Sequence, residues 1–204
     1  MNRNAGFTLI ELLITLLVAT IVMVWGVPSF QDVMRNNRLT SQTNELLGSL
    51  NLARSEAIKR GATVSVCKSK NGTQCNNSAT CSTGGASGSV SWSDGWIVFV
   101  NNASGSGTDV KCVDTNEQII QVHGALPENF TLNPNSNFTN YISYKTDGSS
   151  NTLGTFAFCY DNKTNVAKTV AVSQSGRARV GTDTNGNGIP EKEDGTEITS
   201  CTSP

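Results

Sequence analysis

Two arginines near the end of the chain are the clearest candidates for chemistry. Five of the seven arginines lie at or before position 60, and the other two, Arg177 and Arg179, stand together in the segment SQSGRARVG. On a β-strand, residues two positions apart project from the same face, about 6 to 7 Å from each other. Phosphates along one DNA strand have a comparable separation, and each guanidinium can bind a phosphate with two hydrogen bonds. The pair therefore predicts a phosphate-binding surface, where Gly176 leaves room for close approach of the backbone.

Two further features bear on this prediction. Lys163 and Lys168 extend the cationic surface if their hairpin lies beside the arginines. Two phosphate contacts alone give weak, salt-sensitive binding, which becomes effective when several copies act on one polyanion. In the alternative interpretation the arginines form ion pairs that fix the C-terminal tail, as charges on edge strands often do. The acids available for such pairs are Asp183, Glu191, Glu193 and Asp194.

The charge balance limits what this surface can bind. The net charge of the chain is −1, and after residue 60 there are nine lysines and arginines against twelve aspartates and glutamates. Contact with a polyanion therefore needs a local patch, because bulk attraction is excluded. We expect no enzymatic activity, since the sequence offers a single histidine, His123, and neither a phosphate-binding loop nor a catalytic metal cluster.

Oxygen-bearing side chains follow the arginines at the rhythm of a calcium-binding loop. Residues 183–194, DTNGNGIPEKED, place Asp183, Asn185 and Asn187 at alternate positions, a glycine at the sharp turn and Asp194 in the last place. This spacing matches the EF-hand pattern and predicts a calcium site. Two neutral amides among the first three ligands and an aspartate in the final place depart from that pattern. An Asn-Gly turn cluster without metal is the alternative.

All six cysteines lie after residue 60. Their even number in a small, loop-rich region predicts disulfides that form outside the cytosol. Zinc is disfavoured because the chain has no CxxC pair and a single histidine. Six cysteines allow 15 pairings, and we expect Cys159 with Cys201, Cys75 with Cys81, and Cys67 with Cys112.

The elements that position these residues begin with an apolar N-terminal segment. Residues 7–27, FTLIELLITLLVATIVMVWGV, carry a single charge at Glu11 and are long enough to cross a bilayer as a helix. An ordinary secretory signal has a shorter apolar core that ends in small residues, whereas here Gly6 precedes the apolar run. Arg3 predicts that this end stays cytoplasmic, with the rest of the chain outside. A carboxylate in hydrocarbon is costly, which makes Glu11 a functional candidate.

The helix is expected to resume after Pro28 and to continue over residues 28–60. Gly61 ends it as a C-cap, directly after Lys59 and Arg60, whose charges suit a helix C-terminus. Apolar and small residues recur at spacings of four and three, which predicts a stripe that packs on a globular head. The residues of this stripe are Leu39, Thr43, Leu46, Leu50, Ala53 and Ala57.

Short β-rich runs replace the helical period in the region 61–204. Turn signals such as Asp94-Gly95 and Asp147-Gly148 separate these runs, and the tract 71–89 is typical of an exposed loop. The pattern predicts an α+β fold, in which an antiparallel β head packs on the long helix. The expected runs are 63–67, 90–92, 96–100, 118–122, 130–132, 141–144, 155–160, 168–172 and 178–180.

The N-terminus also carries a specific resemblance. The segment GFTLIELL behind a short basic leader resembles the class III signal of type IV pilins and type II secretion pseudopilins. The resemblance implies that residues 1–6 are a leader, that prepilin peptidase cleaves between Gly6 and Phe7, and that the amino group of Phe7 is methylated. Glu11 then becomes the fifth residue of the mature chain, where the amino terminus of a neighbouring subunit is its natural partner. An acid merely tolerated near a membrane edge is the alternative.

The remainder of the chain is similar to the GspH/FimT/FimU family of minor pilins and pseudopilins, and most like FimT. The similarity rests on LNLARSEAIKRG, TVSVC, DGWIVFVN, EQII and SGRARVG, together with the C-terminal cysteine. It implies a pilin-like N-terminal helix, transmembrane in its first half, packed on two β-sheets. The FimT branch is implicated in DNA uptake during natural transformation, and a GRxR motif contributes to DNA binding. Gly176, Arg177 and Arg179 match that motif.

The resemblance implies a minor type IV pilin that takes part in pilus assembly and in DNA uptake. Its expected partners are other major and minor pilins, prepilin peptidase, the inner-membrane assembly platform and double-stranded DNA. The chain is then a single-pass protein of the bacterial inner membrane with a periplasmic head, and later part of a pilus at the cell surface. Two alternatives stay open: a structural FimU-like minor pilin without ligand, and a GspH-like minor pseudopilin of type II secretion.

Overall fold

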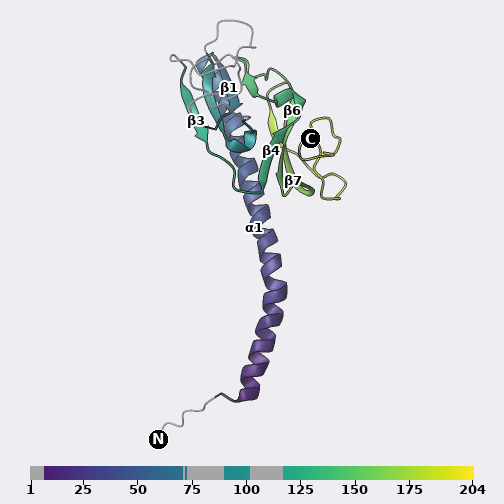
Figure 1. Cartoon of the computed structure of the whole chain (residues 1–204). Helices are drawn as coiled ribbons and strands as arrows, with labels where there is room; N and C mark the ends of the chain where they lie inside the picture. The colour runs from purple at the N-terminus through teal and green to yellow at the C-terminus, as the bar shows by residue number, and fades with distance from the viewer. Residues whose placement is uncertain (1–6, 71, 73–89, 102–116) are drawn as a thin grey trace. The chain divides into compact units, whose positions relative to one another are not determined.

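The computed structural model describes residues 7–70, 72, 90–101 and 117–204 (Figure 1). The chain divides into two compact units, residues 1–38 and 39–204. One long helix, α1, runs from Leu9 to Arg60 and has residues in both units. The helix continues beyond Pro28, as expected, and it does so as one unbroken element.

In the first unit, residues 9–38 are helical, and the stretch up to Val27 exposes apolar side chains on all sides. From Phe7 to Met34 its large apolar side chains are exposed. By length and composition, this part of α1 is suited to cross a membrane. A helix that is apolar all round and uncovered by protein requires an apolar phase around it.

In the second unit, α1 presents a buried stripe to the head. The six stripe residues predicted from the sequence are each at most 1% exposed: Leu39, Thr43, Leu46, Leu50, Ala53 and Ala57. The helix ends where predicted, because Gly61 adopts a left-handed φ of 61°. The N–H of Ala62 then donates to the carbonyl oxygen of Ala57 at 3.3 Å, which satisfies a carbonyl of the last turn.

Two four-stranded antiparallel sheets form the head (Figure 1). The first has the order β3-β2-β1-β5 and the second the order β4-β6-β7-β8. The α+β architecture predicted from the sequence is confirmed. The strands are β1 (Thr63–Lys68), β2 (Trp96–Asn101), β3 (Ile119–His123), β4 (Phe130–Pro134), β5 (Tyr141–Tyr144), β6 (Gly154–Tyr160), β7 (Lys163–Val172) and β8 (Ala178–Val180).

The run 90–92, predicted as a strand, is not one in the structure. A short 3-10 helix, η1 (Trp92–Asp94), begins there instead, and a second one, η2 (Ser136–Phe138), precedes β5. The Ser91 side chain accepts a hydrogen bond from the N–H of Ser93, and the Asp94 carboxylate accepts one from the N–H of Ser91. This capping box outweighs the β propensity of the apolar residues around it.

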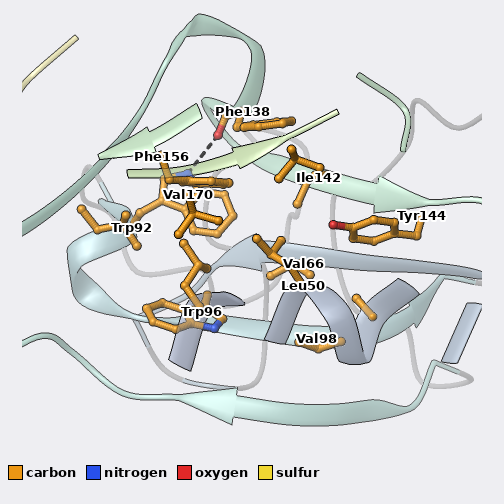
Figure 2. Close-up of a cluster of buried hydrophobic side chains, with 14 of the residues drawn as sticks. Leu50, Val66, Trp92, Trp96, Val98, Phe138, Ile142, Tyr144, Phe156 and Val170 are labelled. Carbon is orange, nitrogen blue, oxygen red and sulfur yellow. Dashed lines mark hydrogen bonds between the residues drawn. The ribbon is translucent and has the colours of Figure 1, made fainter. Parts of the chain in front are cut away.

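One core joins the helix to both sheets (Figure 2). The indole N–H of Trp92 donates to the carbonyl oxygen of Phe138 at 3.0 Å, and the Trp92 ring meets Phe156 edge-on with centroids 4.9 Å apart. On the helix side, the indole N–H of Trp96 donates to Ser49 Oγ at 3.0 Å. Both large indoles therefore bury their rings and still satisfy their donors.

Tyr144 in this core is an exception to that rule. The side chain is fully buried, and its hydroxyl has no hydrogen-bond partner among the described residues. Burial raises the pKa of Tyr144, while the nearby charge of Arg54 acts in the opposite direction. The phenol is therefore held neutral and unpaired at the end of β5.

Changing Tyr144 to Phe is expected to leave the free energy of unfolding at pH 7 unchanged or to raise it by about 1 kcal/mol, because an unpaired buried hydroxyl is removed. Above pH 10 the two proteins diverge. The unfolded phenol ionises there and the folded phenol does not, so the parent loses about 1.4 kcal/mol per pH unit relative to Tyr144→Phe. Urea unfolding of the full chain in detergent at pH 7 and pH 11 measures both effects. Identical pH profiles would show that Tyr144 is not buried in this way.

Candidate functional site

The predicted GRAR segment forms the turn between β7 and β8 and the start of β8. The N–H of Gly176 donates to the carbonyl oxygen of Ser173 at 2.8 Å, and the N–H of Ser173 donates to that of Arg177 at 3.1 Å. Gly176 has a φ of 76°, and a Cβ at this position would overlap the carbonyl oxygen of Gly148. The fold thus requires glycine here, whatever the turn binds.

The two arginines project from the outer face of the second sheet. Ala178 between them packs against the core, so its neighbours on either side point the other way. The Arg179 guanidinium lies 3.4 Å from the carboxylate of Glu193, and its side chain is still 48% exposed. Arg177 is exposed and forms no side-chain hydrogen bond or ion pair with another described residue. Within the described part of the chain, Arg179 therefore follows the tail-fixing interpretation, and Arg177 does not.

The two lysines expected to extend this surface do not lie beside it. β8 pairs with Val170–Val172 at one end of β7, whereas Lys163 pairs with Tyr160 at the other end. At the rise of a strand, the eight positions from Lys163 to Ala171 span about 26 Å. Lys168 lies opposite the buried Phe158, on the core side of the sheet. The expectation that both lysines lie beside the arginines is therefore wrong, since Lys163 lies at the opposite end of β7 from β8 and Lys168 lies on the opposite face of the sheet from Arg179.

The side chains of the candidate calcium loop are engaged in hydrogen bonds within the tail. The Asp183 carboxylate accepts three backbone N–H groups, from Gly186, Asn187 and Gly188, at 2.7 to 3.1 Å. The amides of Asn185 and Asn187 donate to Glu197. Calcium binding at this loop stays a prediction.

Two neighbouring acids are held in the same way. Asp194 accepts from the N–H and hydroxyl of Thr196. The N–H of Thr184 donates to Glu191, which lowers the pKa of that carboxyl. In the part of the chain that the structure describes, no group of three or more His, Cys, Asp or Glu residues is placed to hold a metal ion.

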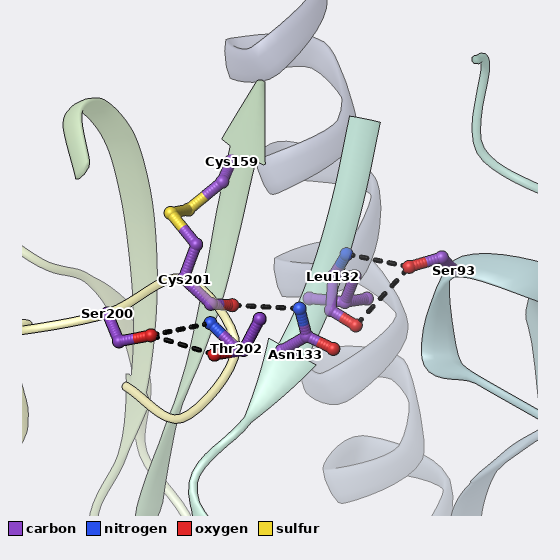
Figure 3. Close-up of a disulfide and its surroundings, with 7 residues drawn as sticks. All are labelled: Ser93, Leu132, Asn133, Cys159, Ser200, Cys201 and Thr202. Carbon is purple, nitrogen blue, oxygen red and sulfur yellow. Dashed lines mark hydrogen bonds between the residues drawn. A yellow bond between two sulfur atoms is a disulfide. The ribbon is translucent and has the colours of Figure 1, made fainter. Parts of the chain in front are cut away.

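A disulfide fixes the tail to the outer face of the second sheet (Figure 3). The predicted bond between Cys159 and Cys201 is present, and the Asn133 side-chain amide donates to the Cys201 carbonyl oxygen at 2.8 Å. The tail also covers Ala157 and Ala167 with Ile198. A segment with few apolar residues is thereby held on the sheet.

The other two predicted disulfides involve residues outside the described part of the chain. Cys67 is disulfide-bonded. Its predicted partner, Cys112, is not among the described residues, and neither are Cys75 and Cys81. The pairings Cys67–Cys112 and Cys75–Cys81 stay predictions.

His123 joins β3 to the helix. Its ring stacks on Trp96 with centroids 3.7 Å apart, Nε2 lies 2.5 Å from a Glu45 carboxylate oxygen, and Nδ1 lies 2.7 Å from the Gly124 carbonyl oxygen. These contacts give His123 a structural role in which both ring nitrogens have hydrogen-bond partners.

The candidate assembly residues lie at the beginning of α1. Glu11 is in the first turn of the helix, Phe7 is 86% exposed, and Gly6 lies outside the described residues. Thr8, which sequence reasoning missed, caps the helix, because its hydroxyl accepts the N–H of Glu11 at 3.3 Å. The pattern Thr-x-x-Glu is the signal that could have revealed it.

Sequence reasoning also missed a role for Arg54. Its guanidinium donates through Nε to the carbonyl oxygen of Gly148 at 3.0 Å and through Nη2 to that of Ser175 at 3.2 Å. These partners lie 94 and 121 positions away in the sequence. No local pattern could have indicated contacts of that range.

Comparison with known proteins places this arrangement in a family. The family model described as Type II transport protein GspH matches residues 42–176, and the prokaryotic N-terminal methylation motif matches residues 1–27. No curated protein sequence matches this chain.

Two crystal forms of the type IV minor pilin FimU from Pseudomonas aeruginosa share the fold. In space group P21, the FimU structure has 20% identity and a TM-score of 0.54, and the match covers 83% of this chain and 98% of FimU. In space group P65, the FimU structure has 20% identity and a TM-score of 0.50, and the match covers 79% of this chain and 98% of FimU. The minor pseudopilin EpsH of the Vibrio cholerae type 2 secretion system matches at 12% identity with a TM-score of 0.44, over 70% of this chain and 95% of EpsH.

Replacing Cys159 and Cys201 together by alanine is expected to lower the free energy of unfolding by about 4 kcal/mol, because the unfolded chain regains the entropy of a loop that spans 42 residues. Arg179→Gln is the matched control, since an exposed ion pair contributes about 0 to 1 kcal/mol. Denaturant unfolding of the full chain in detergent measures both. Equal losses for the two variants would contradict a disulfide-fixed tail.

Proposed function

This chain belongs to the family of the type II transport protein GspH, whose members are minor pilins and pseudopilins, and from that premise we propose that it is a minor type IV pilin. In this proposal, prepilin peptidase processes the chain at Phe7, and the processed chain joins a pilus through Glu11. Minor pilins and pseudopilins assemble with other pilins, and they are structural proteins rather than enzymes. The apolar helix and the methylation motif fit an anchor in the inner membrane.

The observation that carries this proposal is one acid in an uncovered apolar helix. Glu11 lies four residues after Phe7, among side chains such as Leu9, Leu12 and Leu13 that are more than half exposed. In hydrocarbon a lone carboxylate is costly, whereas a carboxylate paired with a positive group is tolerated. Cleavage before Phe7 creates such a group, a new amino terminus, at the same end of the helix.

Pairing between neighbouring subunits would set their axial stagger. If the amine of one subunit meets Glu11 of the next, parallel helices are offset by the four residues between these groups, about 6 Å at the rise of an α-helix. The same pairing neutralises both charges, so a membrane anchor becomes an assembly contact. A pseudopilin of type II secretion would use the same pairing between Glu11 and the neighbouring amino terminus. The pairing therefore does not depend on which branch of the family the chain belongs to.

A second function, contact with DNA during uptake, is favoured by one observation at β8. Arg177 is exposed and unpaired among the described residues, and it stands beside Arg179, whose pair with Glu193 is exposed. Exposed ion pairs contribute only about 0 to 1 kcal/mol, so a phosphate can replace the carboxylate at little cost. A structural FimU-like pilin without ligand is the alternative, and it predicts no effect of either arginine on DNA.

Replacing Glu11 by leucine is expected to abolish incorporation into filaments, because the amine of the neighbouring subunit loses its partner. Cleavage and membrane insertion should continue, since the apolar segment becomes more apolar. Quantifying the chain in sheared pili and in the membrane fraction, with mass measurement of its first residue, tests this. Thr15→Val, a polar-to-apolar change on the same helix, is the control. Parental levels of Glu11→Leu in pili would overturn the assembly role.

Replacing Arg177 by glutamine is expected to weaken binding to double-stranded DNA, and the change in both Arg177 and Arg179 to weaken it further. Each lost phosphate contact lowers the slope of log affinity against log salt by about 0.9. Gel-shift titrations of the full chain in a neutral detergent at several salt concentrations measure this. Absence of binding by the parent, or unaltered binding by the double variant, would remove DNA contact.

A further inference from the structure

The turn that carries Arg177 lies against a second turn, residues 145–149. The Ser150 hydroxyl donates to the carbonyl oxygen of Ser173 at 2.9 Å, and the N–H of Ser150 donates to that of Gln174 at 3.2 Å. Gly176 packs so closely on the Gly148 carbonyl oxygen that no Cβ fits between them. The two turns are therefore held side by side, although they are far apart in the sequence.

Arg54 of α1 fastens both turns to the helix. Its Nε donates to the carbonyl oxygen of Gly148 in one turn, and its Nη2 donates to that of Ser175 in the other. A guanidinium has five N–H groups in a fixed fork, so these two bonds leave three donors unused by these contacts. Lysine could not replace it here, because an ammonium lacks the fork that reaches two acceptors in fixed directions.

This surface carries an excess of positive charge. Lys145 and Arg177 are exposed, and the half-buried Arg54 contacts both turns at the carbonyl oxygens of Gly148 and Ser175. The acid within the two turns is Asp147, whose carboxylate accepts the hydroxyl and N–H of Ser149 at 2.6 and 2.8 Å. These hydrogen bonds lower the pKa of Asp147 and hold its charge on its own turn. Three cations thus oppose one engaged acid.

We propose that Arg177, Lys145 and Arg54 form one surface that binds the phosphodiester backbone of double-stranded DNA, with Arg54 also serving as the positioning residue that sets the two turns. The inference rests on the proposed DNA contact of Arg177. In this proposal the cation that extends the DNA contact of Arg177 is Lys145, in the turn that begins there, and no longer Lys163 of the β6–β7 hairpin.

The exposed side chains of the two turns favour DNA over an acidic protein. They are all polar or charged: Lys145, Thr146, Asp147, Gln174, Ser175 and Arg177. Protein interfaces usually bury an apolar core within a polar rim, whereas interfaces with DNA are polar and strongly positive. Neither turn itself has an exposed apolar side chain, and both offer cations; the apolar side chain next to them is Ile58 of α1, which is 52% exposed and lies against Gly148.

Salt-dependent gel shifts of the full chain in neutral detergent, with a 30-base-pair duplex, test this surface. Lys145→Gln is expected to lower the slope of log affinity against log salt by about 0.9, so that raising salt from 50 to 200 mM costs it about 3.5-fold less affinity than it costs the parent. Lys163→Gln removes the same charge elsewhere and should bind like the parent. Arg54→Lys keeps the charge but loses the fork, and should also bind more weakly.

The outcomes separate the two levels of the proposal. If changing Arg177 and Arg179 to glutamine leaves binding unaltered, the proposed DNA contact itself fails. If that double change weakens binding while Lys145→Gln and Arg54→Lys bind like the parent, DNA contact stands and the enlarged surface is overturned. Should Arg54→Lys fail to fold, Lys145→Gln against Lys163→Gln decides alone. Competition by polyglutamate as strong as that by DNA of equal charge would assign the surface to an acidic protein.

Discussion

The structure depends on how one helix, α1, places its apolar side chains in two different surroundings. In residues 39–60, α1 buries a stripe that includes Leu46, Leu50 and Ala53 against the sheets of the head. From Leu9 to Met34 the large apolar side chains of the same helix have no protein cover. Apolar surface of this extent is stable only in an apolar phase, and inside that phase a charged Glu11 carboxylate is costly unless a positive group pairs with it.

The head uses its helix as a frame for the candidate ligand surface. Trp96 and His123 connect the first sheet to α1 through Ser49 and Glu45. Arg54, further along the helix, connects α1 to the two turns that present Lys145 and Arg177. The disulfide fixes the tail on the opposite side of the second sheet, where Glu193 reaches Arg179. Of the two arginines on that face, Arg179 pairs with Glu193 of the tail, and Arg177 is exposed with no side-chain partner among the described residues.

Local patterns predicted the parts of this molecule that local physics determines. The stripe from Leu39 to Ala57, the cap at Gly61 and most strands follow from periodicity and turn chemistry. The methylation motif is recognised from a short contiguous segment of the sequence, so it needs no information about the fold. Prediction failed where the outcome depends on contacts across the chain. The position of Lys163 depends on which end of β7 receives β8, and the contact of Arg54 with Ser175 spans 121 positions. The predicted strand at Trp92 was wrong for a local reason, because side-chain capping by Ser91 outweighed β propensity.

The central claim is that Glu11 pairs, within the apolar core of a filament, with the amino terminus of an adjacent subunit. A membrane-permeable carbodiimide joins a carboxylate to an amine only where the two are in contact. Applied to intact pili that contain this chain, it should give an amide between the Glu11 side chain and the first residue of a neighbouring subunit, identifiable by peptide mass. Recovery of Glu11 unmodified, or coupled only within its own subunit, from pili in which other buried carboxylates have reacted would contradict the account.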